Sequence, residues 1–220
     1  LSSYNCMNKI ISKKIFEKNK ILTPKFFSIE KYSSENKIIK KMLKKKKISF
    51  PIVIKPVNEG SSLGVKIVKN YNHLNKSAKD LFKKYNQLIF EEYIGGQEIQ
   101  AAVLNSKALG AIELIPKRSF YDYKAKYNRS AKTKHIMPAN LKKTDYIKVL
   151  KISRRAHKAL KCKGVTRADF KFFKNKFYLL EINTQPGMTS LSLVPEIARY
   201  CGITFPNLIE KILLDASINR

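Results

Sequence analysis

Apolar residues recur at helical spacing in several stretches of the chain. In the first stretch, Ile10, Ile11 and Ile15 fall on one face, and Thr23-Pro24 ends the segment. We predict helices over about residues 7–19, 38–47, 74–82, 144–160, 194–201 and 206–215.

Other stretches are short apolar runs or alternate between apolar and polar residues, as β-strands do. The run from Phe50 to Pro56 is bounded by prolines and predicts a buried strand. The alternation of Ile99, Ala101 and Val103 predicts a half-buried strand. We expect further strands over 26–29, 65–68, 88–94, 109–115, 165–173 and 177–183. Together these elements predict an α+β fold with mostly antiparallel strands.

Residues 116–142 contain no convincing periodic element and are rich in Tyr, Lys and Arg. A loop of this length inside a compact domain is usually a functional lid or a disordered segment. We therefore expect a mobile loop at 116–142.

The composition limits the classes of protein to which the chain can belong. Its 220 residues are 44% hydrophobic, which is enough for one core or two small ones. No run of about 18 apolar residues occurs, so we expect no membrane-spanning segment. The opening Leu1-Ser2-Ser3 lacks the features of a signal peptide, and we interpret it as the cut edge of a longer protein.

The three cysteines, Cys6, Cys162 and Cys201, are far apart in the sequence and form no CxxC pair. Their number and spacing argue against a disulfide framework or a zinc site and fit a reducing cytoplasm. We expect three buried or unreactive thiols.

The formal net charge of +29 at first suggests a nucleic-acid partner. However, the excess is nearly all Lys, whereas nucleic-acid surfaces favour the planar, bidentate guanidinium of Arg. The lysines are also spread along the chain rather than interleaved with aromatic residues in one patch. We therefore expect a solvated surface without a specific nucleic-acid site, although weak binding to polyanions follows from the charge.

The predicted strands 165–173 and 177–183 flank a short polar turn and form a candidate hairpin. Because side chains alternate between strand faces, pairing would gather Asp169, Glu181 and Asn183 beside Arg167. Oxygen ligands at this spacing suit Mg²⁺, and a neighbouring cation can steady the charge of a transferring phosphoryl group. An ordinary charged surface explains less well why a carboxylate and an amide end an apolar strand. We predict that the opposite face of the second strand carries Tyr178, Leu180 and Ile182.

Two further groups are less specific when taken alone. The loop Gly60–Gly64 could bring backbone N–H groups to phosphate oxygens, with Lys55 adding a positive charge. A strand end at Glu91–Ile94 could present backbone groups to an adenine edge, and Glu98 could accept hydrogen bonds from ribose hydroxyls. In isolation, a hairpin turn is the better interpretation of the loop, and surface acids explain the glutamates equally well.

Taken in order, these pieces resemble the D-alanine–D-alanine ligase family, whose members have the ATP-grasp fold. The resemblance is carried by MNK at 7–9, IKPVNEGSSLG at 54–64, EEYIGGQE at 91–98, FYDYKAKY at 120–127, VTRAD at 165–169 and LEINTQPGMTSLSLVP at 180–195. The last segment and FYDYKAKY are specific to this family, whereas the metal face alone fits any ATP-grasp enzyme. The family fold implies two α+β subdomains around a nucleotide site, over 1–95 and 96–220.

The resemblance implies an ATP-dependent ligation. ATP phosphorylates the carboxylate of one D-alanine, and the amine of a second D-alanine attacks the acyl phosphate. The product, D-alanyl-D-alanine, serves peptidoglycan precursor synthesis. The implied cofactors are ATP with two Mg²⁺ or Mn²⁺ ions, in a cytoplasmic enzyme that is a homodimer when complete. The family's amino-terminal domain is expected to be missing here, which would favour nucleotide binding over ligation.

The resemblance also implies roles for individual residues. Contacts to the ATP phosphates are implied for Lys9, Lys55 and Lys126. Adenine and ribose would be framed by Glu91, Ile94 and Glu98, with Glu92 at a position where some relatives carry Lys. The implied metal ligands are Asp169, Glu181 and Asn183.

On the substrate side, the tetrahedral intermediate would be stabilised by Arg167 and the backbone of Gly187. The carboxylate of the second D-alanine would be held by Ser192 and Leu193. Near the first D-alanine, the resemblance places Ser61 and Tyr127, the latter matching D-alanine-using members. The alternatives are an ATP-grasp ligase with another substrate, a nucleotide-binding fragment without ligase activity, a basic nucleic-acid-binding protein and a structural remnant.

Overall fold

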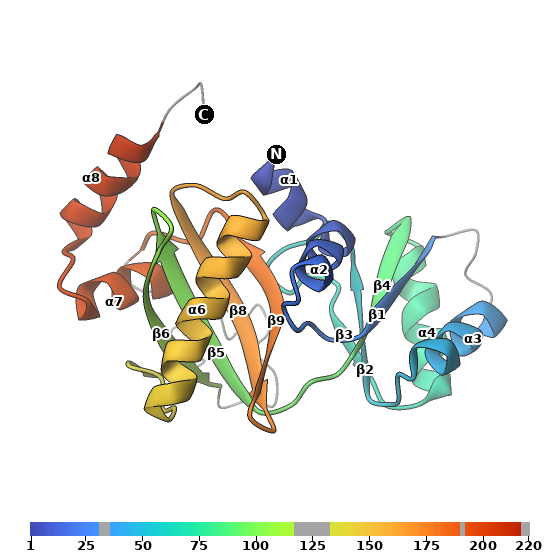
Figure 1. The fold of residues 1–220 in the computed structure, drawn as a ribbon. Helices are drawn as coiled ribbons and strands as arrows, with labels where there is room; N and C mark the ends of the chain where they lie inside the picture. Colours follow the sequence, from blue (N-terminus) through green and yellow to red (C-terminus); the bar gives the residue numbers. More distant parts are fainter. Residues whose placement is uncertain (31–35, 117–132, 190–191, 217–220) are drawn as a thin grey trace.

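The computed structural model describes residues 1–30, 36–116, 133–189 and 192–216. Two antiparallel sheets lie side by side, and helices cover them (Figure 1). This arrangement confirms the predicted α+β class with mostly antiparallel strands.

The first sheet has four antiparallel strands in the order β1-β4-β2-β3. Its strands are β1 (Phe26–Glu30), β2 (Ile52–Pro56), β3 (Lys66–Val68) and β4 (Gln87–Glu92). Two helices cover this sheet, α3 (Asn36–Lys46) and α4 (Tyr71–Phe82) (Figure 1). Ile39 of α3 and Leu74 of α4 pack with Ile54 and Phe90 of the sheet in one fully buried cluster. The apolar faces predicted from helical spacing therefore form the core on this side.

The second sheet has five antiparallel strands in the order β7-β6-β5-β8-β9. Its strands are β5 (Gln97–Leu104), β6 (Lys107–Ile115), β7 (Lys134–Ile136), β8 (Val165–Phe173) and β9 (Lys176–Asn183). The helices around it are α1 (Ser2–Met7), α2 (Lys9–Lys18), α6 (Lys143–Ala159), α7 (Leu193–Tyr200) and α8 (Phe205–Asp215).

Helices cover both faces of the second sheet. On one face, Ile99 and Phe170 pack with Val149 of α6 and Phe16 of α2. On the other face, Ala102, Leu104 and Ile112 pack with Val194 and Ile197 of α7. The prediction of a half-buried strand at 99–103 is therefore wrong, because β5 is the central strand and its residues 99–104 are all buried.

The helix predicted over 7–19 is divided into α1 and α2. Asn8 separates them with an extended backbone, and its side-chain oxygen accepts hydrogen bonds from the N–H groups of Ile10 and Ile11, both at 3.1 Å. Asn is a preferred residue at this capping position because it satisfies N–H groups that have no partner inside the helix. The cap fixes Lys9 as the first residue of α2.

The predicted loop at 116–142 is partly structured. Residues Lys134–Ile136 pair with β6 as β7, and Ala139 is buried with its N–H donating to the Ala111 carbonyl at 2.9 Å. A strand of three residues is too short to produce a detectable alternation, which is why the sequence did not predict it. The part of the predicted loop at 117–132 lies outside the described residues.

Two of the three cysteines meet in the fold. The Sγ atoms of Cys6 in α1 and Cys162 after α6 lie 3.8 Å apart and are buried, and all three cysteines are free thiols. Cys201 is exposed.

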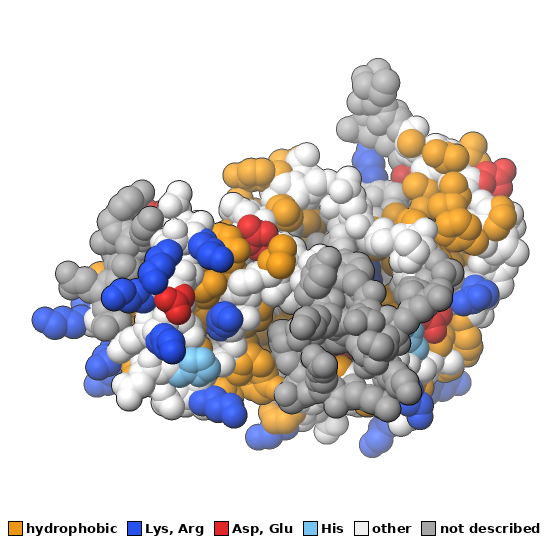
Figure 2. Space-filling model, turned by 180° about the vertical axis from the view of Figure 1, so that it is seen from behind, with side chains coloured by type: hydrophobic (Ala, Val, Ile, Leu, Met, Phe, Trp, Pro, Cys, Tyr) orange, Lys and Arg blue, Asp and Glu red, His pale blue; other side chains and the backbone are white. Residues whose placement is uncertain are grey.

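The surface carries the expected lysines. Figure 2 shows Lys and Arg side chains gathered at the end of the molecule where α3 and α4 lie, with others more scattered. The last turn of α3 contains Lys44, Lys45 and Lys46, where cations are favoured by the helix dipole. Within the described residues, no helix has the length and apolarity needed to cross a membrane.

Candidate functional site

A cavity opens between the two sheets, and side chains from both sheets line it. The first sheet and its loops contribute Lys55, Gly60, Glu91 and Ile94, whereas the second contributes Glu98, Asp169 and Glu181. Segments far apart in the sequence thus meet at one site. It contains most of the residues that the sequence indicated for nucleotide and metal binding.

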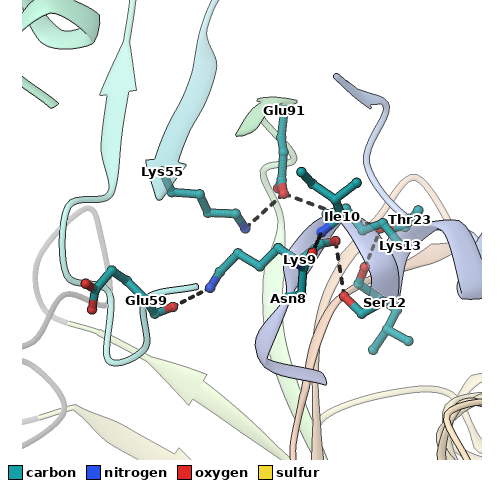
Figure 3. Close-up of polar contacts among 10 residues, drawn as sticks. Asn8, Lys9, Ile10, Ser12, Lys13, Thr23, Lys55, Glu59 and Glu91 are labelled. Carbon is teal, nitrogen blue, oxygen red and sulfur yellow. Dashed lines mark hydrogen bonds and ion pairs between the residues drawn. The ribbon is translucent and has the colours of Figure 1, made fainter. Parts of the chain in front are cut away.

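Basic side chains form one wall of the cavity. Lys55 on β2 lies 3.0 Å from Glu91 on the neighbouring strand β4. Lys9, at the start of α2, donates a hydrogen bond from Nζ to the backbone carbonyl of Glu59 (Figure 3). Burial lowers the pKa of Lys9 from its ordinary value. Two ammonium groups therefore lie at this wall, where they can bind an anion.

Glu91 is completely buried between two lysines. Its Oε1 lies 3.0 Å from Lys55 Nζ and 3.4 Å from Lys13 Nζ (Figure 3). Burial alone would raise the pKa of Glu91, but the positive charges of Lys13 and Lys55 outweigh burial and lower it. The carboxylate is therefore ionised at neutral pH and presents a fixed negative charge.

Sequence reasoning missed Lys13. It lies four residues after Lys9 on the same face of α2, and both side chains are buried. A signal was available in this spacing, since residues i and i+4 are neighbours on a helix surface. Lysines are nevertheless so common in this chain that one of them gives no reason to expect burial.

The loop Gly60–Gly64 is a tight turn at the cavity rim. Ser61, Ser62 and Gly64 have positive φ angles of 51°, 61° and 70°. A Cβ on Gly64 would lie 2.7 Å from Pro56 Cγ, so only glycine fits there. Gly60, Ser62 and Leu63 line the cavity beside Lys55, which supports the phosphate-loop interpretation.

The end of β4 and the segment after it form the rim between the sheets. Glu92, Ile94 and Glu98 all line the cavity. Glu98 accepts a hydrogen bond from Lys171 Nζ of β8 at 3.0 Å. Additional cavity residues that the sequence did not indicate include Pro24, Lys171 and Leu180.

The hairpin of β8 and β9 confirms the predicted gathering of polar side chains. Asp169 is paired with Glu181 and Arg167 with Asn183, and the pair Ala168–Ile182 lies between them, so all four lie at alternate positions on one face. Arg167 Nε and Nη2 donate to the two oxygens of Asp169 at 2.8 and 2.9 Å. The Asn183 side-chain oxygen accepts from the Gln185 N–H at 2.9 Å, which fixes the orientation of the amide.

The prediction that Tyr178, Leu180 and Ile182 share one face is wrong. The pairing shifts between Asp169 and Phe170, so that Asp169 pairs with Glu181 but Phe170 pairs with Leu179. The irregularity places Leu179 and Ile182 in the core while Leu180 lines the cavity next to Glu181. A β-bulge leaves no mark in the alternation of this sequence, since apolar residues occupy 179, 180 and 182.

The residues on the β8–β9 face can hold a divalent cation. Asp169 and Glu181 offer two carboxylates at the cavity, and Asn183 offers an amide oxygen two residues further along β9. Mg²⁺ prefers such oxygen donors and takes its remaining ligands from phosphate and water. Among the described residues, no group of three His, Cys, Asp or Glu side chains is placed to bind a metal, so a site here needs the amide or a ligand oxygen.

The segment after β9 brings Gly187 and Ser192 together. A Cβ on Gly187 would lie 2.8 Å from Ser192 Oγ, and Ser192 Oγ accepts from the Thr189 N–H at 3.0 Å. The side chain of Leu193 is buried in the core against α7 and β6 neighbours, so only its backbone N–H, at the start of α7, can face a ligand. Lys126 and Tyr127 lie outside the described residues.

Known proteins share this sequence and fold. A family profile described as "D-ala D-ala ligase C-terminus" matches residues 15–214. A D-alanine–D-alanine ligase of Pelagibacter ubique is 59% identical over 220 residues, which are 100% of this chain and 71% of the relative. One from Geotalea uraniireducens is 42% identical over 219 residues, covering 99% of this chain and 68% of the relative.

Solved structures agree with these relatives. A D-alanine–D-alanine ligase of Bacillus anthracis complexed with ATP aligns with a TM-score of 0.81 at 33% identity, over 98% of this chain and 68% of the other. The VanG D-Ala:D-Ser ligase of Enterococcus faecalis aligns with a TM-score of 0.85 at 28% identity, over 97% of this chain and 62% of the other.

A cavity between two antiparallel sheets, lined by lysines and carboxylates from both, is the site of the ATP-grasp class of enzymes. The likeness to solved ligases confirms that class for this chain. Within the class, the chain belongs to the D-alanine–D-alanine ligase family.

Proposed function

We propose that the chain binds ATP between its two sheets and uses it to join two D-alanine molecules through an acyl-phosphate intermediate. The product would serve peptidoglycan synthesis. The observation that carries the proposal is that Asp169 and Glu181, paired on β8 and β9, line the same cavity as Lys55 and Glu91 of the first sheet. Cations and oxygen ligands gathered at one cavity can hold a nucleotide triphosphate by both its phosphates and its metal.

ATP binding is supported at three places in the cavity. Lys9 and Lys55 would contact the phosphates, because their ammonium groups lie on one wall beside the Gly60–Gly64 loop. Glu91, Glu92 and Ile94 would frame the adenine, and Glu98 would accept hydrogen bonds from the ribose. In the relative from Bacillus anthracis, the corresponding fold was solved in complex with ATP.

Two Mg²⁺ or Mn²⁺ ions would be held by Asp169, Glu181 and Asn183. When bound, such ions neutralise phosphate charge and orient the γ-phosphoryl group for transfer. Arg167 donates two hydrogen bonds to Asp169, so it fixes this carboxylate and places a further positive charge beside it. That charge would stabilise the oxyanion of the tetrahedral intermediate, together with the Gly187 backbone N–H.

The amino-acid substrates would bind beside the β8–β9 face. Ser192 and the backbone N–H of Leu193 lie at the start of α7, where a carboxylate is favoured by free N–H groups and the helix dipole. Ser61 and Tyr127 would lie near the first D-alanine, and Lys126 would reach the γ-phosphate. In this arrangement, the acyl phosphate forms where the phosphates and the first D-alanine meet.

A second candidate differs only in the amine substrate. The D-Ala:D-Ser ligase from Enterococcus faecalis has the same fold, so the fold alone does not select D-alanine. Two observations favour D-alanine: the relatives of 59% and 42% identity are D-alanine–D-alanine ligases, whereas the D-Ala:D-Ser ligase is 28% identical. We further propose a cytoplasmic enzyme that forms homodimers.

The reaction is tested by phosphate release from ATP with D-alanine, D-serine or D-lactate as the second substrate. We expect release that depends on both ATP and D-alanine, with D-alanyl-D-alanine detected by mass spectrometry. Release with D-serine but not with D-alanine alone would support the second candidate. ATP binding without release under any condition would identify a nucleotide-binding fragment without ligase activity.

A further inference from the structure

Lys13 is a buried lysine that links both sheets. Its side chain has no solvent exposure, and its Nζ donates to Thr23 Oγ1 at 2.7 Å (Figure 3). Thr23 Oγ1 donates in turn to the Leu179 carbonyl of β9 at 2.8 Å, while Glu91 on β4 lies 3.4 Å from Lys13 Nζ. A buried ammonium group is costly unless its partners compensate. This cost makes a purely space-filling role a poor explanation for Lys13.

Lys13 and Lys55 share one oxygen of Glu91 but face different surroundings. Lys55 lines the cavity, whereas Lys13 does not. With Lys55 alone, the carboxylate of Glu91 would neutralise the cavity lysine. With Lys13 behind it, the group of two ammonium ions and one carboxylate keeps a net positive charge, although only Lys55 and Glu91 line the cavity.

We infer that Lys13 is a positioning residue for the anionic part of the ligand. Through Glu91 it holds the Lys55 ammonium at the cavity wall and keeps the local charge positive. Thr23 fixes the direction of the Lys13 ammonium by accepting its hydrogen bond. The inference rests on the proposed function, because the anion would be the triphosphate of ATP.

Calorimetric titration with ATP and with adenosine separates this role from a general structural one. Lys13→Met removes the charge and keeps much of the aliphatic length. We expect ATP affinity to fall about tenfold, because loss of one positive charge behind the wall of a partly buried anion site has that order of effect. Adenosine, which has no phosphate, should bind within about twofold of the unsubstituted chain. Lys14→Met is the matched control, since Lys14 is exposed on the same helix, and it should leave both affinities unchanged.

A double-mutant cycle tests whether Lys13 acts through the cavity lysine. If Lys13 positions Lys55, then Lys13→Met should cost much less ATP affinity in a Lys55→Met background than in the unsubstituted chain. Additive losses would overturn the inference, as would equal losses for ATP and adenosine. An unchanged ATP affinity in Lys13→Met would overturn it too.

If Lys13→Met does not fold, Thr23→Val can be tested in its place, because it keeps every charge and removes only the hydroxyl that binds Lys13. Loss of the fixing hydroxyl should weaken ATP about threefold while adenosine binding is unchanged, and no loss for ATP would overturn the inference. Absence of ATP binding by the unsubstituted chain would contradict the proposed function instead, so the two failures are distinguishable.

Discussion

Glu91 remains ionised although it is completely buried, because two lysines lie within 3.4 Å of its Oε1. Burial also lowers the pKa of Lys13 to about 8, against the attraction of Glu91. Each charge in this group is therefore tolerated only in the presence of the others. Removal of the Glu91 carboxylate leaves Lys13 and Lys55 in the interior without their counter-ion.

Replacement of Glu91 by Gln should destabilise the fold at neutral pH. We expect a loss of about 3–5 kcal/mol in the free energy of unfolding, since Lys13 and Lys55 lose their shared counter-ion. The measurement is urea unfolding at pH 7, with Glu92→Gln as the less buried control. Equal stability of the Glu91 variant and the unsubstituted chain would contradict the ion-pair description.

The same group predicts a pH dependence. The pKa of Glu91 is lower in the folded chain than its ordinary value, so its stabilising effect is complete above that ordinary value and is lost as pH falls through the lowered pKa. Urea unfolding from pH 7 to pH 3 should therefore show a steeper loss of stability for the unsubstituted chain than for Glu91→Gln. Parallel curves for the two proteins would argue against this assignment.

Glu181 tests the metal interpretation at the level of one side chain. Glu181→Gln keeps the shape but removes the charge, so Mg²⁺-dependent ATP binding should fall at least about tenfold while the melting temperature stays within a few degrees. Asp80→Asn, an exposed residue paired with Lys83, is the matched control. ATP affinity unchanged at matched Mg²⁺ would rule out Glu181 as a ligand.

At the scale of elements, the turn after β2 depends on one glycine. Gly64 has a φ of 70° and no room for a Cβ beside Pro56, whereas a Cβ on Gly60 would meet nothing within 4 Å. Gly64→Ala should therefore destabilise the fold by about 1–3 kcal/mol and weaken ATP binding, while Gly60→Ala should change stability little. Thermal unfolding of the two variants provides the check, and equal melting temperatures would contradict the predicted difference.

The sequence predicts elements well wherever local spacing determines them. Apolar residues at helical spacing predicted α3, α4 and α6 to within a few residues, and alternation in β8 and β9 predicted that Asp169, Glu181 and Asn183 share a face beside Arg167. It fails where tertiary contacts decide. The burial of β5 on both faces, the bulge after Asp169 and the three-residue β7 all depend on neighbours distant in sequence.

The candidate site shows the same division. The polar face of the hairpin follows from residue alternation alone, whereas Lys9, Ser192 and Leu193 were expected only from the family resemblance. Lys13 and Leu180 were missed, because the first is one lysine among many and the second changes face at a bulge. The burial of Lys13 and the register around Leu180 depend on contacts that form only when the two sheets assemble.

For the whole molecule, α2 joins the two sheets around the cavity. Phe16 packs in the core of the second sheet, whereas Ile10 packs against Val57 and Ile89 beside the first. The predicted division at residue 95 would place α2 with the first sheet, and that division stays a prediction. Because α2 contacts both sheets, the positions of Lys9 and Lys13 depend on how the two sheets lie relative to each other.

Calorimetric titration of this chain with ATP, with and without Mg²⁺ at moderate salt, tests the nucleotide site most directly. Saturable binding that requires Mg²⁺ is the expected result, because the lysine wall and the Asp169–Glu181 face act on the same triphosphate. The contradicting result is weak binding that does not saturate and has the same affinity with and without Mg²⁺. Such binding would reflect only the net charge of +29, and it would contradict an ATP site between the two sheets.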